Sequence, residues 1–64
     1  MDRNSIATKL RNLRGVKTMA EVAKAIGVSK SAMGMYETGR RVPRDDVKKR
    51  IAEYYNCPVA DLFF

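Results

Sequence analysis

The junction at Gly27 restricts the fold of this chain more than any other feature. Residues 18–26, "TMAEVAKAI", and residues 29–38, "SKSAMGMYET", have short helical patterns, and only Gly27 and Val28 separate them. Glycine adopts the left-handed conformation that ends a helix and lets the chain turn sharply. A helix, a tight glycine turn and a second helix form a helix-turn-helix unit, so we expect the two segments to pack together.

The residue types within both segments support this interpretation. Thr18 followed by Glu21 is a capping-box pattern, and Ser29 is a favoured N-cap residue. Met33 and Tyr36 are expected to point from the second helix into the core, and Gly39 is expected to end it. Apolar residues of the first segment recur at helical spacing, at Met19, Val22, Ala23 and Ile26.

Three further helices are predicted around this unit. The first helix has Ile6, Leu10 and Leu13 on one face and ends at Gly15. The fourth starts near Pro43 and has Asp45 and Asp46 in its first turn, and its expected buried residues are Val47, Ile51, Tyr54 and Tyr55. The last helix spans residues 58–64, with Pro58 early in it. No segment has the pattern of a strand. We therefore expect one all-α domain of five helices over residues 1–64.

Length and composition narrow the class of protein. A domain of 64 residues buries only about 60% of its unfolded surface, which leaves no room for a deep catalytic cleft. No apolar run approaches the roughly 20 residues of a membrane span, and the first residues lack a signal-peptide core. One cysteine, Cys57, and no histidine exclude an internal disulfide and a Cys/His metal site. We expect a cytoplasmic protein without metal or cofactor.

The charge favours a polyanionic partner. Thirteen Lys and Arg against seven Asp and Glu give a net charge of +6. All thirteen lie in residues 1–50, whereas residues 51–64 carry only Glu53 and Asp61. The chain is therefore predicted to have a basic body and an apolar, slightly acidic tail.

One long run connects these features to a known family. Residues 23–43 contain the pattern "AxxxGVSxSxMxxYExGxRxP", and the likeness extends from "LRNLRG" to "IAEYYNCPVADLFF". The sequence resembles the Cro/repressor type of helix-turn-helix domain, the Xre-like family, which includes phage Cro proteins and small bacterial regulators. The resemblance implies a lambda-repressor-like fold, sequence-specific binding of double-stranded DNA, and transcriptional regulation in a bacterium or by a phage within one.

The resemblance also implies a set of DNA contacts. The helix starting at Ser29 would enter the major groove and read bases through Ser29, Lys30, Ser31, Gly34 and Met35. Met19 stands where family members often carry a glutamine that contacts the DNA backbone. Because methionine cannot make that hydrogen bond, the phosphate contact at this helix start would fall to backbone N–H groups, Thr18 or Lys17.

Most of these residues also have a purely structural interpretation. Ser29 acts first as an N-cap, whereas Lys30 opposes the helix dipole, which favours a DNA contact. Gly34 is either a tolerated flaw or a means of close approach to the groove, and both interpretations stay open. Met35 would suit a thymine methyl group or be an ordinary exposed apolar residue. Cys57 is expected to act as a small apolar residue.

Two further clusters follow from the basic body. Arg40, Arg41 and Arg44 come directly after the proposed reading helix, and we interpret them as a phosphate clamp rather than a solvated face. Lys48, Lys49 and Arg50 are interpreted as a solvated face. By resemblance, Glu37 matches a family glutamate that pairs with an arginine of the first helix, and Arg11 is the candidate partner.

The alternatives to DNA binding are an enzyme, a protein-binding module and an RNA-binding protein. No nucleophile or acid/base pair is present beyond the helix-start residues Asp45 and Asp46, so an enzyme is not expected. An antitoxin-like role, in which the domain binds another protein, remains an alternative. RNA binding is disfavoured because no aromatic residue lies on the basic segment for base stacking. The small size favours a repressor over an activator.

The apolar tail is expected to hold a two-fold dimer. Val59, Leu62, Phe63 and Phe64 exceed what a thin core would absorb, and the segment carries no basic residue. Two reading helices roughly 34 Å apart would need a near-palindromic operator with half-sites about 10 base pairs apart. The expected partners are therefore double-stranded DNA and a second copy of the chain, with no membrane.

Overall fold

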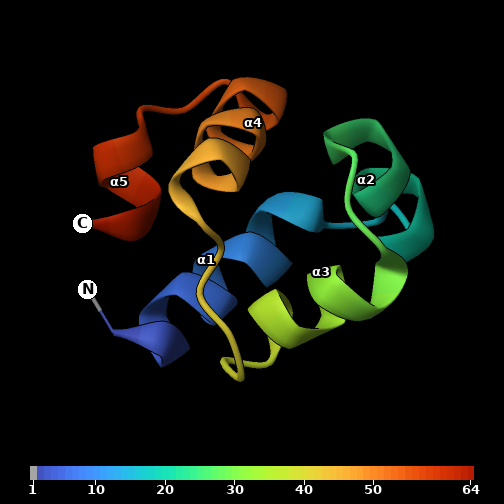
Figure 1. Cartoon of the computed structure of the whole chain (residues 1–64), viewed down its shortest axis with the longest axis horizontal. Coiled ribbons are helices and arrows are strands. Elements are labelled where there is room, and N and C mark those ends of the chain that lie inside the picture. Colours follow the sequence, from blue (N-terminus) through green and yellow to red (C-terminus); the bar gives the residue numbers. More distant parts are fainter. Residues whose placement is uncertain (1) are drawn as a thin grey trace.

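The computed structural model describes residues 2–64, which form five α-helices and no strand. The helices are α1 (Arg3–Arg14), α2 (Met19–Ile26), α3 (Lys30–Glu37), α4 (Asp45–Tyr55) and α5 (Val59–Phe63). Figure 1 shows α2 and α3 on one side of the molecule and α5 on the other. The predicted all-α, five-helix fold is confirmed. Within residues 2–64, no helix has both the length and the apolar character that crossing a membrane requires.

Side-chain caps start the first three helices. Asp2, Thr18 and Ser29 each accept a hydrogen bond from the backbone N–H three residues later, at 2.8, 3.1 and 3.0 Å. Each bond satisfies a donor that has no partner within its own helix. The predicted caps at Thr18 and Ser29 are confirmed, and they fix where the two helices of the helix-turn-helix unit begin.

Glycines make the two turns that flank α3. Gly27 has φ +89°, and an added Cβ would lie 3.0 Å from the Arg50 Nη1 atom. Gly39 has φ +76°, and a Cβ there would lie 2.9 Å from the Asn4 side-chain oxygen. Both positions require a conformation that other residues adopt at a cost, so these glycines set the direction in which α3 enters and leaves the fold.

One apolar core joins all five helices. Leu10, Val22, Met33 and Ile51 come from α1 to α4 and are completely buried. Helix α3 packs against α1 and α2, while α5 packs against α4 and α1. The prediction that Met33 and Tyr36 point inward is confirmed, since they are 0% and 6% exposed.

The apolar tail differs from the prediction. Leu62 and Phe63 were expected at a dimer interface, but each is only 3% exposed and belongs to the core. This prediction is wrong because α5 folds back onto α4 and α1 and completes the core of the single chain. Phe64 remains 68% exposed, and Val59 is partly exposed.

Smaller differences concern where helices begin and which faces they bury. Helix α4 begins at Asp45, two residues after Pro43, and α5 begins at Val59. Leu13 was expected in the core but is 37% exposed, because the buried face of α1 continues through Ala7 instead. The first turn of α4 carries the two aspartates as predicted, and the helix dipole stabilises their negative charges there.

Tyr55 has the one buried side-chain polar atom without a hydrogen-bond partner in the described part of the chain. Its ring packs edge to face against Tyr54, with centroids 5.0 Å apart. Burial of the hydroxyl raises the Tyr55 pKa to about 12, and the nearby negative charge of Glu37 contributes in the same direction. The fold therefore favours the neutral form of Tyr55.

We expect Tyr55→Phe to remove part of the alkaline sensitivity of this fold. The Tyr55 pKa is about 12 in the folded chain against 10.0 without the fold, so the unfolded chain loses its proton first. The free energy of unfolding should thus fall as the pH rises from 10 toward 12. At pH 7 the variant should be unchanged or up to about 1 kcal/mol more stable.

Urea unfolding at pH 7 and pH 11, followed by circular dichroism, measures this difference. An equal loss of stability at pH 11 in both proteins would show that Tyr55 is not responsible.

Candidate nucleic-acid interface

Helix α3 divides into an inner and an outer face. Met33, Tyr36 and Glu37 are buried, whereas Lys30 and Ser31 are exposed. The side chains predicted to read bases gather on the outer side of this helix or at its start: Ser29, Lys30 and Ser31 are exposed, and Gly34 and Met35 are half-buried. The structure therefore brings these five residues to one accessible surface.

Gly34 is not required by packing within the chain. A Cβ at this position would lie 3.5 Å from the Met19 sulfur, which is an ordinary van der Waals distance. Glycine in the interior of a helix costs about 1 kcal/mol relative to alanine. Steric crowding inside the protein thus does not explain this residue.

A buried ion pair anchors the end of α3 to α1. The Glu37 side chain is 1% exposed, and its two carboxylate oxygens accept hydrogen bonds from Arg14 Nε at 2.9 and 3.0 Å. The Arg14 side chain is 24% exposed. A buried carboxylate requires such a partner, because removal of its charge from water is costly.

The predicted partner of Glu37 is wrong. Arg11 donates instead to the main-chain carbonyl of Glu37, and its second nitrogen lies 3.3 Å from the Thr8 hydroxyl oxygen. Arg11 and Arg14 are three residues apart and therefore lie on nearly the same face of α1. Helical periodicity does not distinguish them, and only the approach of α3 determines which one meets the carboxylate.

Arg14 also contacts the segment that leads into α2. Its Nη1 donates to the Lys17 carbonyl at 2.9 Å. The Lys17 ammonium lies 4.8 Å from the centre of the Tyr54 ring and donates to the Tyr54 hydroxyl at 3.0 Å, and this hydrogen bond raises the Lys17 pKa. Lys17 was predicted at the DNA backbone, but its charge is engaged with α4 in the unbound chain.

The start of α2 keeps backbone donors near the surface. Thr18 is exposed and caps the helix, and Met19 is half-buried. The first N–H groups of an α-helix have no acceptor within the helix, and they carry the positive end of its dipole. These two residues thus present main-chain donors to a negative group, independent of the Met19 side chain.

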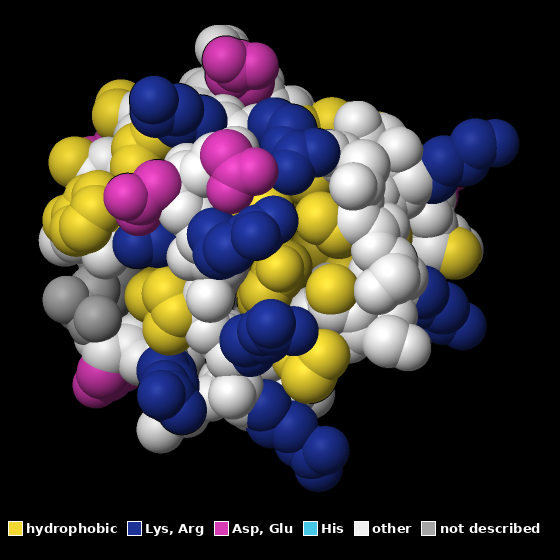
Figure 2. Space-filling view, in the orientation of Figure 1, with side chains coloured by type: hydrophobic (Ala, Val, Ile, Leu, Met, Phe, Trp, Pro, Cys, Tyr) yellow, Lys and Arg dark blue, Asp and Glu magenta, His cyan; other side chains and the backbone are white. Residues whose placement is uncertain are grey.

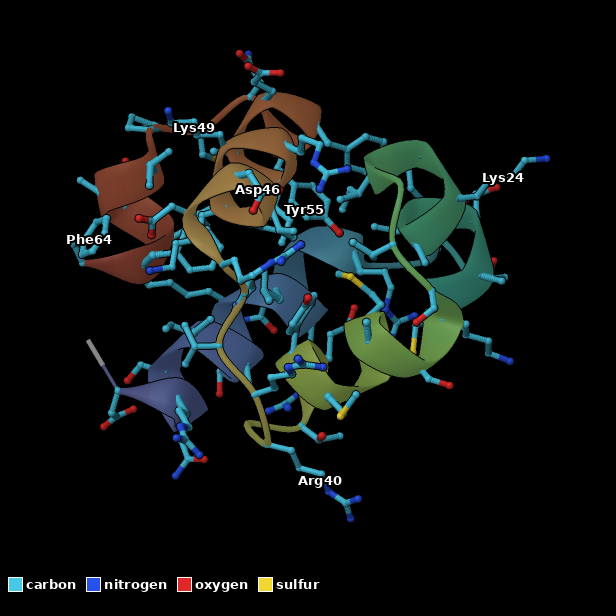
Figure 3. The ribbon with its side chains drawn as sticks, in the orientation of Figure 1. Lys24, Arg40, Asp46, Lys49, Tyr55 and Phe64 are labelled. Carbon is cyan, nitrogen blue, oxygen red and sulfur yellow. The ribbon has the colours of Figure 1, made fainter. Side chains whose placement is uncertain are left out.

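The segment after α3 carries three cations within five residues. The N–H groups of Arg40 and Arg41 donate to the Met35 carbonyl at 3.0 and 3.3 Å, which holds the segment against the end of α3. Arg40, Arg41 and Arg44 are all exposed. Figure 3 shows Arg40 extending away from the body of the protein below α3.

Charge is unevenly distributed over the visible face. Figure 2 shows Lys and Arg side chains across its middle and along its lower and right edges, with apolar side chains between them. Most of the visible acidic side chains lie at the upper left. Basic side chains lie over the segment that joins α3 to α4 and along the edges of the molecule around α3.

Two cations of α4 have structural contacts that the sequence did not indicate. Arg50 Nη1 donates to the Ile26 carbonyl at the end of α2, at 3.2 Å. The Lys48 side chain is only 14% exposed, and its ammonium lies 4.9 Å from the centre of the Phe64 ring. Both were interpreted as part of a solvated face. Their partners are distant in sequence or lie on another helix, so local patterns give no sign of them.

Residues 2–64 contain no group of three or more His, Cys, Asp or Glu side chains that could hold a metal ion. Cys57 is a free, half-buried thiol whose sulfur lies 3.3 Å from the Tyr55 carbonyl oxygen.

Comparisons with known proteins agree with this geometry. Residues 5–62 match the family described as helix-turn-helix domain. The cryptic phage CTXphi transcriptional repressor RstR of Vibrio cholerae is 34% identical over 58 residues, which cover 88% of this chain and 52% of RstR. The chain thus spans about half the length of that relative.

A solved structure is similar over almost the whole chain. The solution structure of the SOS-response transcriptional repressor LexA from Eubacterium rectale superposes with a TM-score of 0.91 at 28% sequence identity. The match covers 98% of this chain and 69% of that one.

Arg14→Ala is expected to destabilise the fold by on the order of 3 kcal/mol, because it leaves the buried Glu37 carboxylate without its partner. Arg11→Ala should lower the free energy of unfolding clearly less, since Arg11 donates its hydrogen bond to a main-chain carbonyl. Urea unfolding of the two variants and the wild type gives both values. Equal losses, or a larger loss for Arg11→Ala, would contradict the assignment of Arg14 as the charge partner.

Proposed function

Since the chain belongs to the helix-turn-helix domain family, we propose that it is a transcriptional regulator that binds double-stranded DNA sequence-specifically and acts as a repressor. The observation that carries this proposal is the outer face of α3, which is accessible and lies beside the cations of residues 40–44. The printed names of both RstR and LexA describe transcriptional repressors, which supports the direction of regulation. Such a regulator works in the cytoplasm, where bacterial DNA lies.

Base readout is assigned to the first half of α3. An α-helix fits the major groove of B-DNA, where each base pair presents a distinct pattern of donors and acceptors. Lys30 lies in the first turn, where its charge opposes the helix dipole, so the fold itself gains nothing from it. Ser29 and Ser31 flank it. Met35 suits a thymine methyl group, and Gly34 allows the helix to approach the bases closely.

Phosphate contacts are assigned to two segments on either side of α3. Arg40, Arg41 and Arg44 supply charge after the helix, and the backbone N–H groups at Thr18 and Met19 supply donors at the start of α2. Contacts of this kind dominate affinity and fix orientation, but they carry no sequence information. Lys17 already donates a hydrogen bond to the Tyr54 hydroxyl, so we assign it a minor part.

A two-fold dimer is proposed through the exposed remainder of the tail. With Leu62 and Phe63 in the core, the contact rests on Phe64, which is 68% exposed, and on Val59. Both line one surface hollow beside α4. Figure 3 shows Phe64 at the edge of the molecule opposite α2, away from the basic segment. An interface there leaves α3 free for a near-palindromic operator with half-sites about 10 base pairs apart.

Lys30→Ala should reduce discrimination among DNA sites, with about 1 to 3 kcal/mol lost at one base position. Arg41→Ala should instead weaken binding to all sequences together and lower the salt dependence. Duplexes selected from a random pool, titrated at two stated salt concentrations, separate the two effects. Uniform weakening by Lys30→Ala would rule out its role in base readout, and salt-independent binding would favour the alternative of a protein partner.

Phe64→Ser should weaken self-association and operator binding without unfolding the chain, because the ring is exposed. Val16→Ser is the matched control, since Val16 is fully exposed but lies in the segment between α1 and α2. Sedimentation at micromolar concentration and titration with a palindromic duplex provide the two readouts. A wild-type monomer, with DNA binding equal in all three proteins, would refute the tail dimer.

A further inference from the structure

A surface hollow of about 380 Å³ lies beside the reading helix. Three segments form it: the turn between α2 and α3, the segment between α3 and α4, and the first half of α4. Figure 1 shows the segment that joins α3 to α4 passing in front of α1 to reach the start of α4. The hollow is separate from the side chains assigned to base readout, except for Ser29, which lies at its edge.

Three arginines line this hollow: Arg41, Arg44 and Arg50. The lining contains no acidic side chain. Asp46 lies next to it, with Oδ2 at 3.4 Å from Arg50 Nη2 and Oδ1 at 3.8 Å from Arg44 Nε. Its side chain is 62% exposed, and exposed pairs of this kind contribute only about 0 to 1 kcal/mol. The hollow is therefore strongly positive and only weakly compensated.

Tyr36 adds a neutral donor. Its ring belongs to the core, 6% of its surface remains exposed, and it is one of the residues that line the hollow. A buried tyrosine presents its polar tip where it reaches solvent, so the hydroxyl is the part available to a ligand. Apolar side chains, Val42 and Val47 among them, complete the lining.

We propose that this hollow binds one phosphate group, which replaces Asp46 as the partner of the arginines. Guanidinium groups bind phosphate oxygens in pairs, and a phosphate offers more charge and more acceptors than one carboxylate. The phosphate group can come from the DNA backbone, and for this source the inference rests on the proposed function. A free phosphate monoester has the same chemistry and is the second source.

Asp46 has a definite part in this exchange. In the unbound chain its carboxylate lies beside Arg44 and Arg50, so it competes with phosphate for these two guanidinium groups. Asp46→Asn keeps the size of the side chain but removes the competing charge. It should therefore raise the affinity for phosphate severalfold, an effect that a merely structural role of Asp46 would not produce.

The first test uses inorganic phosphate as the probe, with binding followed by NMR of the Tyr36 ring and the arginine side chains. Tyr36→Phe should weaken binding about tenfold, since a hydrogen bond to a charged group is lost. Arg50→Gln should weaken it at least as much, while its amide can still donate to Ile26. Lys49→Gln removes one exposed positive charge outside this hollow and serves as the matched control.

The second test uses a selected duplex in which single backbone phosphates are replaced by uncharged methylphosphonates. If the group comes from DNA, a methylphosphonate at one position in each half-site should lower the affinity of the wild type for the duplex about tenfold. The same replacement should have little further effect on the affinity of the Tyr36→Phe variant. If no position behaves in this way but inorganic phosphate binds in the hollow, the free phosphate is the source. Urea unfolding confirms that each variant is folded.

The inference is overturned if inorganic phosphate leaves the Tyr36 signals unchanged and no backbone position depends on Tyr36 or Arg50. In that case, salt-dependent binding of the duplex by wild type and variants alike would leave the proposed function intact. Phosphate binding in the hollow without any binding of duplex DNA would have the opposite meaning: the site would stand, and the proposed function would fail.

Discussion

The buried carboxylate of Glu37 is the constraint on which the rest of the structure depends. It lies at the end of α3, is almost completely removed from water, and is neutralised by the two hydrogen bonds from Arg14 Nε. Arg14 also holds the Lys17 carbonyl just before α2, and Arg11 holds the Glu37 carbonyl. These contacts fix the positions of α1, the start of α2 and the end of α3 relative to one another. The surfaces assigned to DNA are therefore preformed in the unbound chain.

The small size of the chain explains how its tail is used. A core built from short helices gains from every apolar residue it encloses, and α5 supplies Leu62 and Phe63 to it. The Lys48 ammonium lies 5.7 and 4.9 Å from the centres of the Phe63 and Phe64 rings. The core therefore takes up most of the large apolar residues of the tail, and Phe64 is the main one that stays exposed.

Local sequence signals predicted the helices and the caps and turns that bound them. The caps at Thr18 and Ser29, the turn at Gly27 and the inward direction of Met33 all follow from spacing and residue type, because each concerns neighbours within one or two turns. These features belong to the chain before tertiary packing is considered. The assignment of residues on the outer face of α3 to DNA comes instead from the resemblance to the Cro/repressor family, and it stays a proposal.

The remaining features depend on contacts between distant segments. Arg14 meets Glu37 across 23 residues, and Arg50 meets Ile26 across 24. Neither partner is specified by periodicity, because Arg11 and Arg14 share a face and Arg50 stands among other cations of α4. The burial of Phe63 likewise depends on how α5 turns back. Local patterns therefore describe each helix well, but not which side chain it meets on another.

A crystal structure of the chain bound to a duplex selected from a random pool tests the central claim most directly. We expect α3 to lie in the major groove, with Lys30 at base edges and residues 40–44 at the phosphates. The ion pair between Arg14 and Glu37 should be the same as in the unbound chain. A complex in which the outer face of α3 points away from the bases, or in which Glu37 has left Arg14, would contradict it.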